Sequence, residues 1–444
     1  MKLEVEHVVE GWRDTGVARA LLDEIRALVA EAGWSTPRVV MEICGTHTMA
    51  VSRWGIRSLL PAELKLISGP GCPVCVTDDD EIDEMIALAF CPGVTVATFG
   101  DLLKVPGTWG TLAEARAKGA QVRVVSSPLD AVALAQAYSP AHGPGEDQAG
   151  AQAPGVRETA VRETAVRETA GGKAGGKEVA SVPEAARVVF LAVGFETTAP
   201  ATALALTRAR NLGLDNFFIY PAHKLTPPAM RALLADPEVR IDGFLIPGHV
   251  STVLGDRAFA FLAEEYDCPA AVAGFEPVDI LAALREIVRR LIEKERPTVV
   301  NTYRRAVRPE GNPRAVQLMH QVFSVVHARW RGLGEVPASG LALRPEWAGF
   351  DARRRLDEEL ARAKLELARR AGEPGDAGGR AQASFARQKA ACRCGDVLRG
   401  KLAPTHCPLF GRACTPARPV GPCMVSSEGA CAAYYRYERA PAAR

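Results

Sequence analysis

Short apolar runs alternate with helical patterns along most of this chain, and this alternation limits the possible fold more than any other feature of the sequence. The strand-like runs lie at 38–43, 64–68, 93–98, 121–126, 187–193, 216–220, 242–246 and 270–274. Helical patterns lie before and between them, at 17–32, 48–60, 78–90, 111–118, 128–138, 197–212, 227–235, 256–265 and 277–294. Strands that alternate with single helices imply βαβ units, so the sequence predicts an α/β fold with parallel sheets.

A change of composition divides this pattern into two halves. Residues 140–182 are rich in Gly, Ala, Pro and Glu and contain the sequence VRETA three times at 156–170, which is typical of a low-complexity linker or insertion. We therefore expect two related parallel-sheet α/β domains, at 1–139 and 183–300, that face a cleft. The remainder, 301–444, is expected to form helices at 312–330 and 351–371 and then a small cysteine-rich domain.

The composition indicates a cytoplasmic protein with metal or redox chemistry. The 444 residues are 48% hydrophobic and carry a formal net charge of only +2, so no global field favours a nucleic acid as partner. The sequence shows neither a signal peptide nor a run of about 18 apolar residues, so we expect no membrane association. Eleven cysteines in such a chain favour metal or redox sites over a disulfide framework.

Cys44 and His47 lie in a short polar loop where the strand-like run 38–43 ends. Open α/β sheets bind their ligands at the carboxyl ends of the strands, so this thiol and imidazole are candidates for a nucleophile or a metal ligand. The alternative is a buried structural cysteine, because free cysteine is among the most buried residue types.

Cys72 and Cys75 follow the next strand-like run in a C-x-x-C motif. The pair could be half of a zinc site, a redox dithiol or part of a turn. No second half-site lies nearby in the sequence, which favours a dithiol that cycles to a disulfide.

Polar loops punctuated by Gly or Pro also follow the strand-like runs of the second half. They contain His223, His249 and Glu276, which we regard as candidate catalytic residues. Ordinary turn chemistry is the alternative for each loop taken singly. The functional interpretation is stronger for the set, because all of these loops fall at the same end of the expected strands.

The end of the chain concentrates six of the eleven cysteines between Cys392 and Cys431. The many prolines between them exclude long helices, so this segment needs a metal centre or covalent links for stability. Zinc and an iron-sulfur cluster both accept four thiolates. The long, unpaired spacings favour a 4Fe-4S cluster.

Several motifs together resemble the HypD family of NiFe-hydrogenase maturation factors. The motifs are CGTHT at 44–48, GPGCPVC at 69–75, PAHK at 221–224, PGHVS at 247–251, GFEP at 274–277 and CMVSSEG at 423–429. The resemblance implies two α/β domains facing a cleft and a third domain with a 4Fe-4S cluster. The family's ligand spacing, C-x14-C-x6-C-x16-C, is met here by Cys392, Cys407, Cys414 and Cys431, with Cys394 and Cys423 as neighbours.

The resemblance also implies a function. HypD-type proteins form a scaffold with a HypC-type chaperone and receive cyanide from a HypE-type donor. The assembled iron, which carries two cyanides and one carbon monoxide, then passes to the hydrogenase large subunit. Carried over to this chain, Cys44 resembles the iron ligand with His47 beside it, and Cys72 and Cys75 resemble the redox pair.

Two other classes remain open from the sequence. A ferredoxin-linked disulfide reductase would need only the cluster and the C-x-x-C motif, with Cys44 incidental. A structural metal-binding interaction module would need no redox dithiol. We favour a redox-active scaffold over a conventional turnover enzyme.

Overall fold

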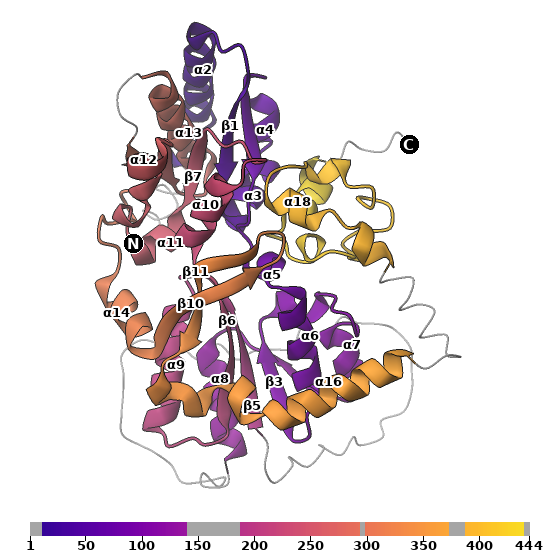
Figure 1. Ribbon diagram of the computed structural model, residues 1–444. Helices are drawn as coiled ribbons and strands as arrows, with labels where there is room; N and C mark the ends of the chain where they lie inside the picture. The colour runs from indigo at the N-terminus through magenta and orange to yellow at the C-terminus, as the bar shows by residue number, and fades with distance from the viewer. Residues whose placement is uncertain (1–10, 140–186, 294–297, 373–386, 439–444) are drawn as a thin grey trace, which may run out of the picture.

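The computed structural model describes residues 11–139, 187–293, 298–372 and 387–438. Two parallel sheets, each covered by helices, lie one above the other in the view of Figure 1, with a two-stranded hairpin between them and the cysteine-rich segment beside them. The prediction of an α/β fold with two parallel sheets and a separate cysteine-rich region is confirmed. The expected linker at 140–182 lies outside the described residues.

The strands are short and mostly buried. Their bounds are β1 Arg38–Glu42, β2 Leu64–Ser68, β3 Val94–Thr98, β4 Gln121–Val124, β5 Arg187–Gly194, β6 Phe217–His223, β7 Gly243–Pro247, β8 Ala270–Ala273, β9 Val299–Asn301, β10 Phe323–Trp330 and β11 Gly334–Leu343.

Helices connect these strands and cover both faces of the sheets. The α-helices are α2 Thr15–Ala32, α3 Gly45–Arg53, α4 Ile56–Leu59, α5 Pro73–Val76, α6 Asp79–Leu88, α7 Leu112–Ala117, α8 Pro128–Tyr138, α9 Ala199–Asn211, α10 Thr226–Ala235, α11 Gly248–Leu254, α12 Phe261–Tyr266, α13 Pro277–Ile292, α14 Pro313–Val322, α15 Ala352–Arg355, α16 Asp357–Gly372, α18 Cys394–Leu398 and α19 Ala430–Ala433. Single turns of 3-10 or π-helix are η1 Gly100–Lys104, η2 Arg257–Phe259, η3 Pro345–Phe350, η4 Pro404–His406, η5 Pro422–Met424 and η6 Tyr434–Glu438. Among the described helices, none is long and apolar enough to cross a membrane.

The five-stranded sheet has the order β2-β1-β7-β8-β9, and all its neighbouring strands are parallel. β7 and β8 are buried at every position, as expected for central strands covered on both faces. One core cluster joins β1 and β8 to α2 and α13, and another joins β7 to α10 and α12 on the opposite face. This sheet therefore combines strands from the beginning and the middle of the chain.

The four-stranded sheet has the order β4-β3-β5-β6 and is also parallel. Its strands lie between β2 and β7 in the sequence, so this sheet is inserted into the chain that forms the five-stranded sheet. The ranges 1–139 and 183–300 expected for the two domains do not match the sheets, because each sheet takes strands from both ranges. Residues 140–182 thus separate two strands of one sheet rather than two sheets.

The helix expected at 312–330 is wrong in its second half. Helix α14 ends at Val322, and the chain continues as β10, which pairs with β11 in an antiparallel hairpin. Isolated bridges attach the hairpin to Lys224, the residue after β6 of the four-stranded sheet, through Gly340, and to Thr77, the residue after α5, through Trp330. These tertiary pairings override the local helical pattern.

Candidate thiol and metal site

Four loops meet at the carboxyl edge of the five-stranded sheet, because its strands are parallel and all end there. Cys44 follows β1, the Cys72 loop follows β2, His249 follows β7 and Phe275 follows β8. The parallel registers therefore bring most of the sequence-predicted site residues to one side of the molecule.

Cys44 is buried and precedes the first residue of α3, with its backbone extended. The N–H of Gly45 donates to the carbonyl of Gly71, 2.9 Å away, so the Cys44 loop is bonded to the loop that carries Cys72. A Cβ on Gly71 would lie 2.3 Å from the nitrogen of Cys44, so only glycine allows this approach of the two backbones.

Two carboxylates flank Cys44. Glu42, at the end of β1, is fully buried and accepts hydrogen bonds from the Cys44 N–H at 3.2 Å and the Thr48 hydroxyl at 2.5 Å. Glu428, from the cysteine-rich segment, accepts a 2.8 Å hydrogen bond from Thr46. A Cβ on Gly45 would lie 2.5 Å from Cβ of Glu428, so the far end of the chain packs directly on the Cys44 loop.

The Cys44 thiol is protonated in this environment. Burial raises its pKa to about 12, and the negative charges of Glu428 and Glu42 add to the increase. The backbone N–H groups of His47 and Thr46, at the start of α3, partly oppose it. A metal that binds this sulfur must therefore displace a proton, since the thiolate is the ligand.

Burial also raises the pKa of Glu42 to about 7, although the charge of Arg57 and several hydrogen bonds favour the ionised form. This carboxyl, which accepts a hydrogen bond from the Cys44 N–H, can therefore change its protonation state near neutral pH.

His47 is a neutral imidazole with one free nitrogen. Its Nε2 lies 2.8 Å from the carbonyl oxygen of Gly274, which can only accept, so Nε2 carries the proton. Burial lowers the pKa of His47 to about 4. Its Nδ1 is buried and has no hydrogen-bond partner among the described residues. The ring packs on Phe275, which also stacks on the ring of His249 at 4.0 Å between centroids.

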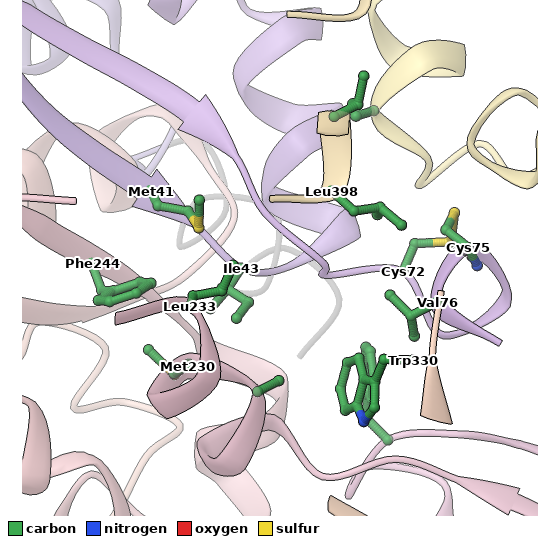
Figure 2. Packing of buried hydrophobic residues seen from close by; sticks show 14 of the residues in the cluster. Met41, Ile43, Cys72, Cys75, Val76, Met230, Leu233, Phe244, Trp330 and Leu398 are labelled. Atoms are coloured by element: carbon green, nitrogen blue, oxygen red, sulfur yellow. Dashed lines mark hydrogen bonds between the residues drawn. A yellow bond between two sulfur atoms is a disulfide. The ribbon is translucent and has the colours of Figure 1, made fainter. Parts of the chain in front are cut away.

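Cys72 and Cys75 are joined by a disulfide, with their Cα atoms 5.2 Å apart. Both residues are buried, and Figure 2 shows the disulfide in an apolar cluster with Val76, Trp330 and Leu398. The pairing that the C-x-x-C motif predicted is present in the structure.

The cysteine-rich segment gathers its thiols in one region. The pKa of the Cys431 thiol is raised, mainly by burial and further by the nearness of the thiols of Cys394, Cys414, Cys392 and Cys407. The N–H of Val420 donates to Cys414 Sγ at 3.3 Å. In the part of this segment that the structure describes the helices are short, and Val397, Leu398 and Met424 pack in the same core cluster as the disulfide.

The thiols of this segment are ligands of the kind that both zinc and iron-sulfur clusters accept. Among the described residues, no three His, Cys, Asp or Glu side chains lie close enough together to hold one metal ion. An iron-sulfur cluster binds each thiolate to a different iron and so accepts sulfur atoms that lie farther apart. Cys392, Cys407, Cys414 and Cys431 would hold such a cluster.

Cys394 and Cys423 form a further thiol pair in the same region. Their sulfur atoms lie 2.7 Å apart and both residues are buried. The carbonyl of Pro422, which precedes Cys423, lies 3.8 Å from Cys75 Sγ, so this pair is adjacent to the disulfide.

Two predicted site residues lie apart from the Cys44 loop. His223 ends β6 in the four-stranded sheet, where its ring contacts Thr202 and Phe323. Glu276 forms two hydrogen bonds with Arg13, at 2.6 and 2.8 Å, and precedes the first residue of α13. Neither contact involves Cys44 or the disulfide.

Sequence reasoning missed Glu42 and Glu428 as neighbours of Cys44, and it gave no role to the Cys394 and Cys423 pair. A charged residue at the end of an otherwise apolar strand was the signal for Glu42. The other contacts join residues more than 300 positions apart or depend on how the tail folds, so no local pattern reveals them.

The fold and the site together define an α/β protein that collects sulfur ligands where its parallel strands end, a class suited to metal and redox chemistry. The family model "HypD: Hydrogenase formation hypA family" matches residues 16–142 and 173–438 of the chain. A "Hydrogenase maturation factor HypD" of Azotobacter vinelandii is 41% identical over 97% of each chain. Proteins of the same name from Rhizobium leguminosarum and Escherichia coli are 40% and 36% identical, over 97% of this chain and 95% and 98% of theirs.

The chain belongs to the HypD family of hydrogenase maturation factors. The resemblance found in the sequence motifs is thereby confirmed.

Proposed function

We propose that this chain is a scaffold on which the iron unit of NiFe-hydrogenase, with two cyanides and one carbon monoxide, is assembled on Cys44. The observation that carries the proposal is the environment of Cys44. Its thiol is buried, its loop is bonded to the disulfide loop, and the cysteine-rich segment covers it. One small site thus combines a soft metal ligand, a redox pair and shielding from water. A thiolate suits low-spin iron with strong-field ligands.

The residues around Cys44 supply the acid-base chemistry of iron binding. The thiol proton must leave when iron arrives, and the nearby acceptors are the carboxylates of Glu42 and Glu428 and the free Nδ1 of His47. The iron and its ligands are the substrate of this site. The family's partners are a HypC-type chaperone and a HypE-type cyanide donor, and we propose both for this chain.

The sulfur pairs supply electrons. Releasing cyanide from a protein-bound thiocyanate takes two electrons, which the Cys72 and Cys75 dithiol provides as it closes to a disulfide. The Cys394 and Cys423 pair lies beside that disulfide and among the proposed cluster ligands, which fits a role as relay. A 4Fe-4S cluster on Cys392, Cys407, Cys414 and Cys431 would supply electrons singly.

Infrared spectra test the proposal. The chain, isolated anaerobically with its chaperone partner, should show bands of iron-bound cyanide and carbon monoxide. We expect Cys44→Ser to remove these bands while the disulfide and the visible absorbance of the cluster remain. Cys91→Ser is the matched control, because Cys91 is also a buried free cysteine but belongs to the core of the four-stranded sheet. Bands that persist in the Cys44→Ser protein would place the iron elsewhere.

A ferredoxin-linked disulfide reductase is the second candidate, favoured by the disulfide lying next to the Cys394 and Cys423 pair. A reductase should contain the iron of one cluster and no infrared bands. A scaffold should contain more iron than one cluster accounts for, and Cys44→Ser should remove only that excess.

A further inference from the structure

The loop that follows β8 holds the ring of His47 through a backbone carbonyl outside the ladder of that strand. His47 Nε2 lies 2.8 Å from the carbonyl oxygen of Gly274, and β8 ends one residue earlier, at Ala273. A glycine beyond the end of a strand has wide conformational freedom, so other contacts must fix this carbonyl. A Cβ on Gly274 would lie 2.3 Å from Oδ2 of Asp279 and 2.7 Å from Cε2 of Tyr303. The loop therefore packs directly on these two side chains.

Asp279 is the centre of the contacts that fix the loop. Its side chain is 1% exposed, and its Oδ2 accepts a 3.3 Å hydrogen bond from the N–H of Glu276, two residues after Gly274. The guanidinium of Arg305 donates to both carboxylate oxygens of Asp279, at 2.7 and 2.5 Å. Such a bidentate pair fixes the orientation of a carboxylate as well as its charge. Arg305 therefore determines where the carboxylate lies, and through it the position of the loop.

Aromatic rings hold Arg305 in turn. Its Cζ lies 3.8 Å from the ring centroid of Trp12, which precedes α2, and 4.5 Å from that of Tyr303. The Tyr303 ring meets the edge of Phe275, and Phe275 packs on His47 with 4.8 Å between ring centroids. Cation–π contacts of this kind restrict an arginine whose side chain is still 34% exposed. The segment before α2 thus reaches the His47 loop through Arg305.

We propose that Arg305 is a positioning residue for His47; this inference rests on the proposed function, in which the iron is assembled beside that imidazole. By fixing the Gly274 carbonyl, Arg305 keeps His47 in the tautomer whose proton is on Nε2. A neutral imidazole has one N–H, so the nitrogen that donates to a carbonyl leaves the lone pair on the other. That other nitrogen, Nδ1, is buried and has no partner among the described residues. It can therefore accept a hydrogen bond from an N–H or O–H group that enters the site.

The loss of Arg305 would leave the Asp279 carboxylate buried without its counter-ion. The carboxylate would then turn toward water or take up a proton, and the loop would lose its anchor. The Ala273 carbonyl, which the pairing of β8 with β7 fixes, also attracts the ring proton of His47, so the effect should be partial. The preference for the Nε2–H tautomer should fall by about fivefold when the Gly274 carbonyl moves, which is the factor that one net hydrogen bond supplies.

Nitrogen NMR of the histidine rings tests this role. The full chain is labelled with isotopic histidine and isolated anaerobically, and long-range nitrogen–proton correlation spectra at neutral pH distinguish protonated from unprotonated ring nitrogens. His47→Gln identifies the signals of His47 by their absence. We expect the wild type to show mainly the Nε2–H tautomer, and Arg305→Gln to lower the ratio of Nε2–H to Nδ1–H by about fivefold. Arg305→Lys should recover part of the ratio, because it keeps the charge but not the bidentate geometry.

Two variants separate this role from a general loss of packing. Arg304→Gln removes the neighbouring exposed arginine, whose Nε donates to the carbonyl of Asn301, and it should leave the tautomer ratio unchanged. Asp279→Asn breaks the ion pair but keeps an oxygen for the N–H of Glu276, so it should lower the ratio as much as Arg305→Gln does. The double variant should show no further change, because both substitutions remove the same pair.

Trp12→Leu provides a milder test should Arg305→Gln unfold the chain. This variant keeps the ion pair with Asp279 and removes one of the two rings beside the guanidinium. The tautomer ratio should fall by about twofold, the factor expected of a partly exposed cation–π contact.

An unchanged tautomer ratio in folded Arg305→Gln and Trp12→Leu proteins would overturn the proposal. An equal loss in Arg304→Gln, or a wild-type His47 with its proton on Nδ1, would do the same. The infrared bands of iron-bound cyanide and carbon monoxide distinguish this failure from that of the proposed function. Wild-type protein without the bands would contradict the scaffold itself, whereas bands together with an unchanged ratio would contradict only the role of Arg305.

Discussion

His223 shows how strongly the fold can change the acid-base behaviour of a single residue. The Thr202 hydroxyl donates to the carbonyl of Thr198 at 3.2 Å, so Nε2 of His223 donates to the Thr202 oxygen at 3.3 Å. Burial and the charge of Lys224 lower the pKa of His223 to about 3. In the unfolded chain the pKa is about 6.5.

The pH dependence of stability should reveal this histidine. Between about pH 6.5 and 3 the unfolded chain binds one proton more at His223 than the folded chain, so stability falls as the pH falls. We expect His223→Gln to remove this loss, and the wild-type minus variant difference to change by up to ~1.4 kcal/mol per pH unit. Urea unfolding at pH 7, 6 and 5 measures it. The exposed His327→Gln variant is the control, and parallel curves for wild type and His223→Gln would contradict the prediction.

The surroundings of a single residue were predictable from the sequence where they depend on its near neighbours in the chain. Cys44 and the Cys72 and Cys75 pair ended apolar runs, and a strand end is a local feature. Glu428 could not be found in this way, because its partner Thr46 lies 382 positions away in the chain.

At the level of elements, a buried ion pair joins β6 to α6. Lys224, the residue after β6, is 2% exposed, and its Nζ lies 2.8 and 3.0 Å from the carboxylate oxygens of Glu81. Glu81 lies in the first turn of α6, three residues after Asp78. Its carboxylate also accepts a hydrogen bond from the Asp78 N–H. Because α6 follows α5, the helix of the disulfide, almost directly, this pair holds the disulfide loop against the four-stranded sheet.

Removing one partner of this pair should be costly. Glu81→Gln keeps an acceptor for the helix cap but leaves the Lys224 cation buried without its counter-ion, and we expect a loss of ~3 kcal/mol in the free energy of unfolding. Adding Lys224→Met should recover part of that loss, because no buried charge then remains unpaired. Urea unfolding of the single and double variants gives both values. Asp80→Asn, on the exposed side of the same helix turn, should change stability by less than ~0.5 kcal/mol. A Glu81→Gln protein as stable as Asp80→Asn would disprove the role of the pair.

Most elements were predictable because apolar periodicity is local, but the hairpin was not. Phe323 and Trp330 at the ends of β10 are buried while the residues between them are largely exposed, which gives neither a clean helical nor a clean strand pattern. The partner strand contains Pro337 and two glycines and therefore reads as a loop. The two strands pair with each other, and bridges to Lys224 and Thr77 attach the hairpin to the rest of the molecule.

On the scale of the whole molecule, the order of strands could not be read from the sequence. Both halves show the same alternation, and periodicity predicts that a strand exists but not which strand it pairs with. The pairing of β1 with β7, about 200 residues apart, creates the five-stranded sheet, and the strands of the other sheet lie between β2 and β7 in the sequence. That pairing is also what brings His249 and Phe275 to the side of Cys44.

The last part of the chain returns to this site. The carboxylate of Glu438 accepts 2.5 Å hydrogen bonds from Ser52 of α3 and from Arg57, and the Arg57 guanidinium lies over the Tyr434 ring. Together with the bond from Thr46 to Glu428, these contacts attach the cysteine-rich segment to the helix that begins after Cys44. The conformational order of the cysteine-rich segment and that of the Cys44 loop should therefore depend on each other.

Hydrogen exchange should detect this coupling. Cys407→Ala removes one proposed ligand of the cluster, so we expect loss of the visible absorbance and loosening of α18 and α19, because metal binding supplies the folding free energy of such a segment. Amides of α3 should then exchange at least about tenfold faster, a local loss of ~1.4 kcal/mol, while the buried strand β5 stays protected. Cys268→Ala, a buried cysteine outside the segment, is the control. If α3 kept wild-type protection after the cluster was lost, the cluster would stabilise only its own segment, and the shielding of Cys44 would have to come from the sheet loops alone.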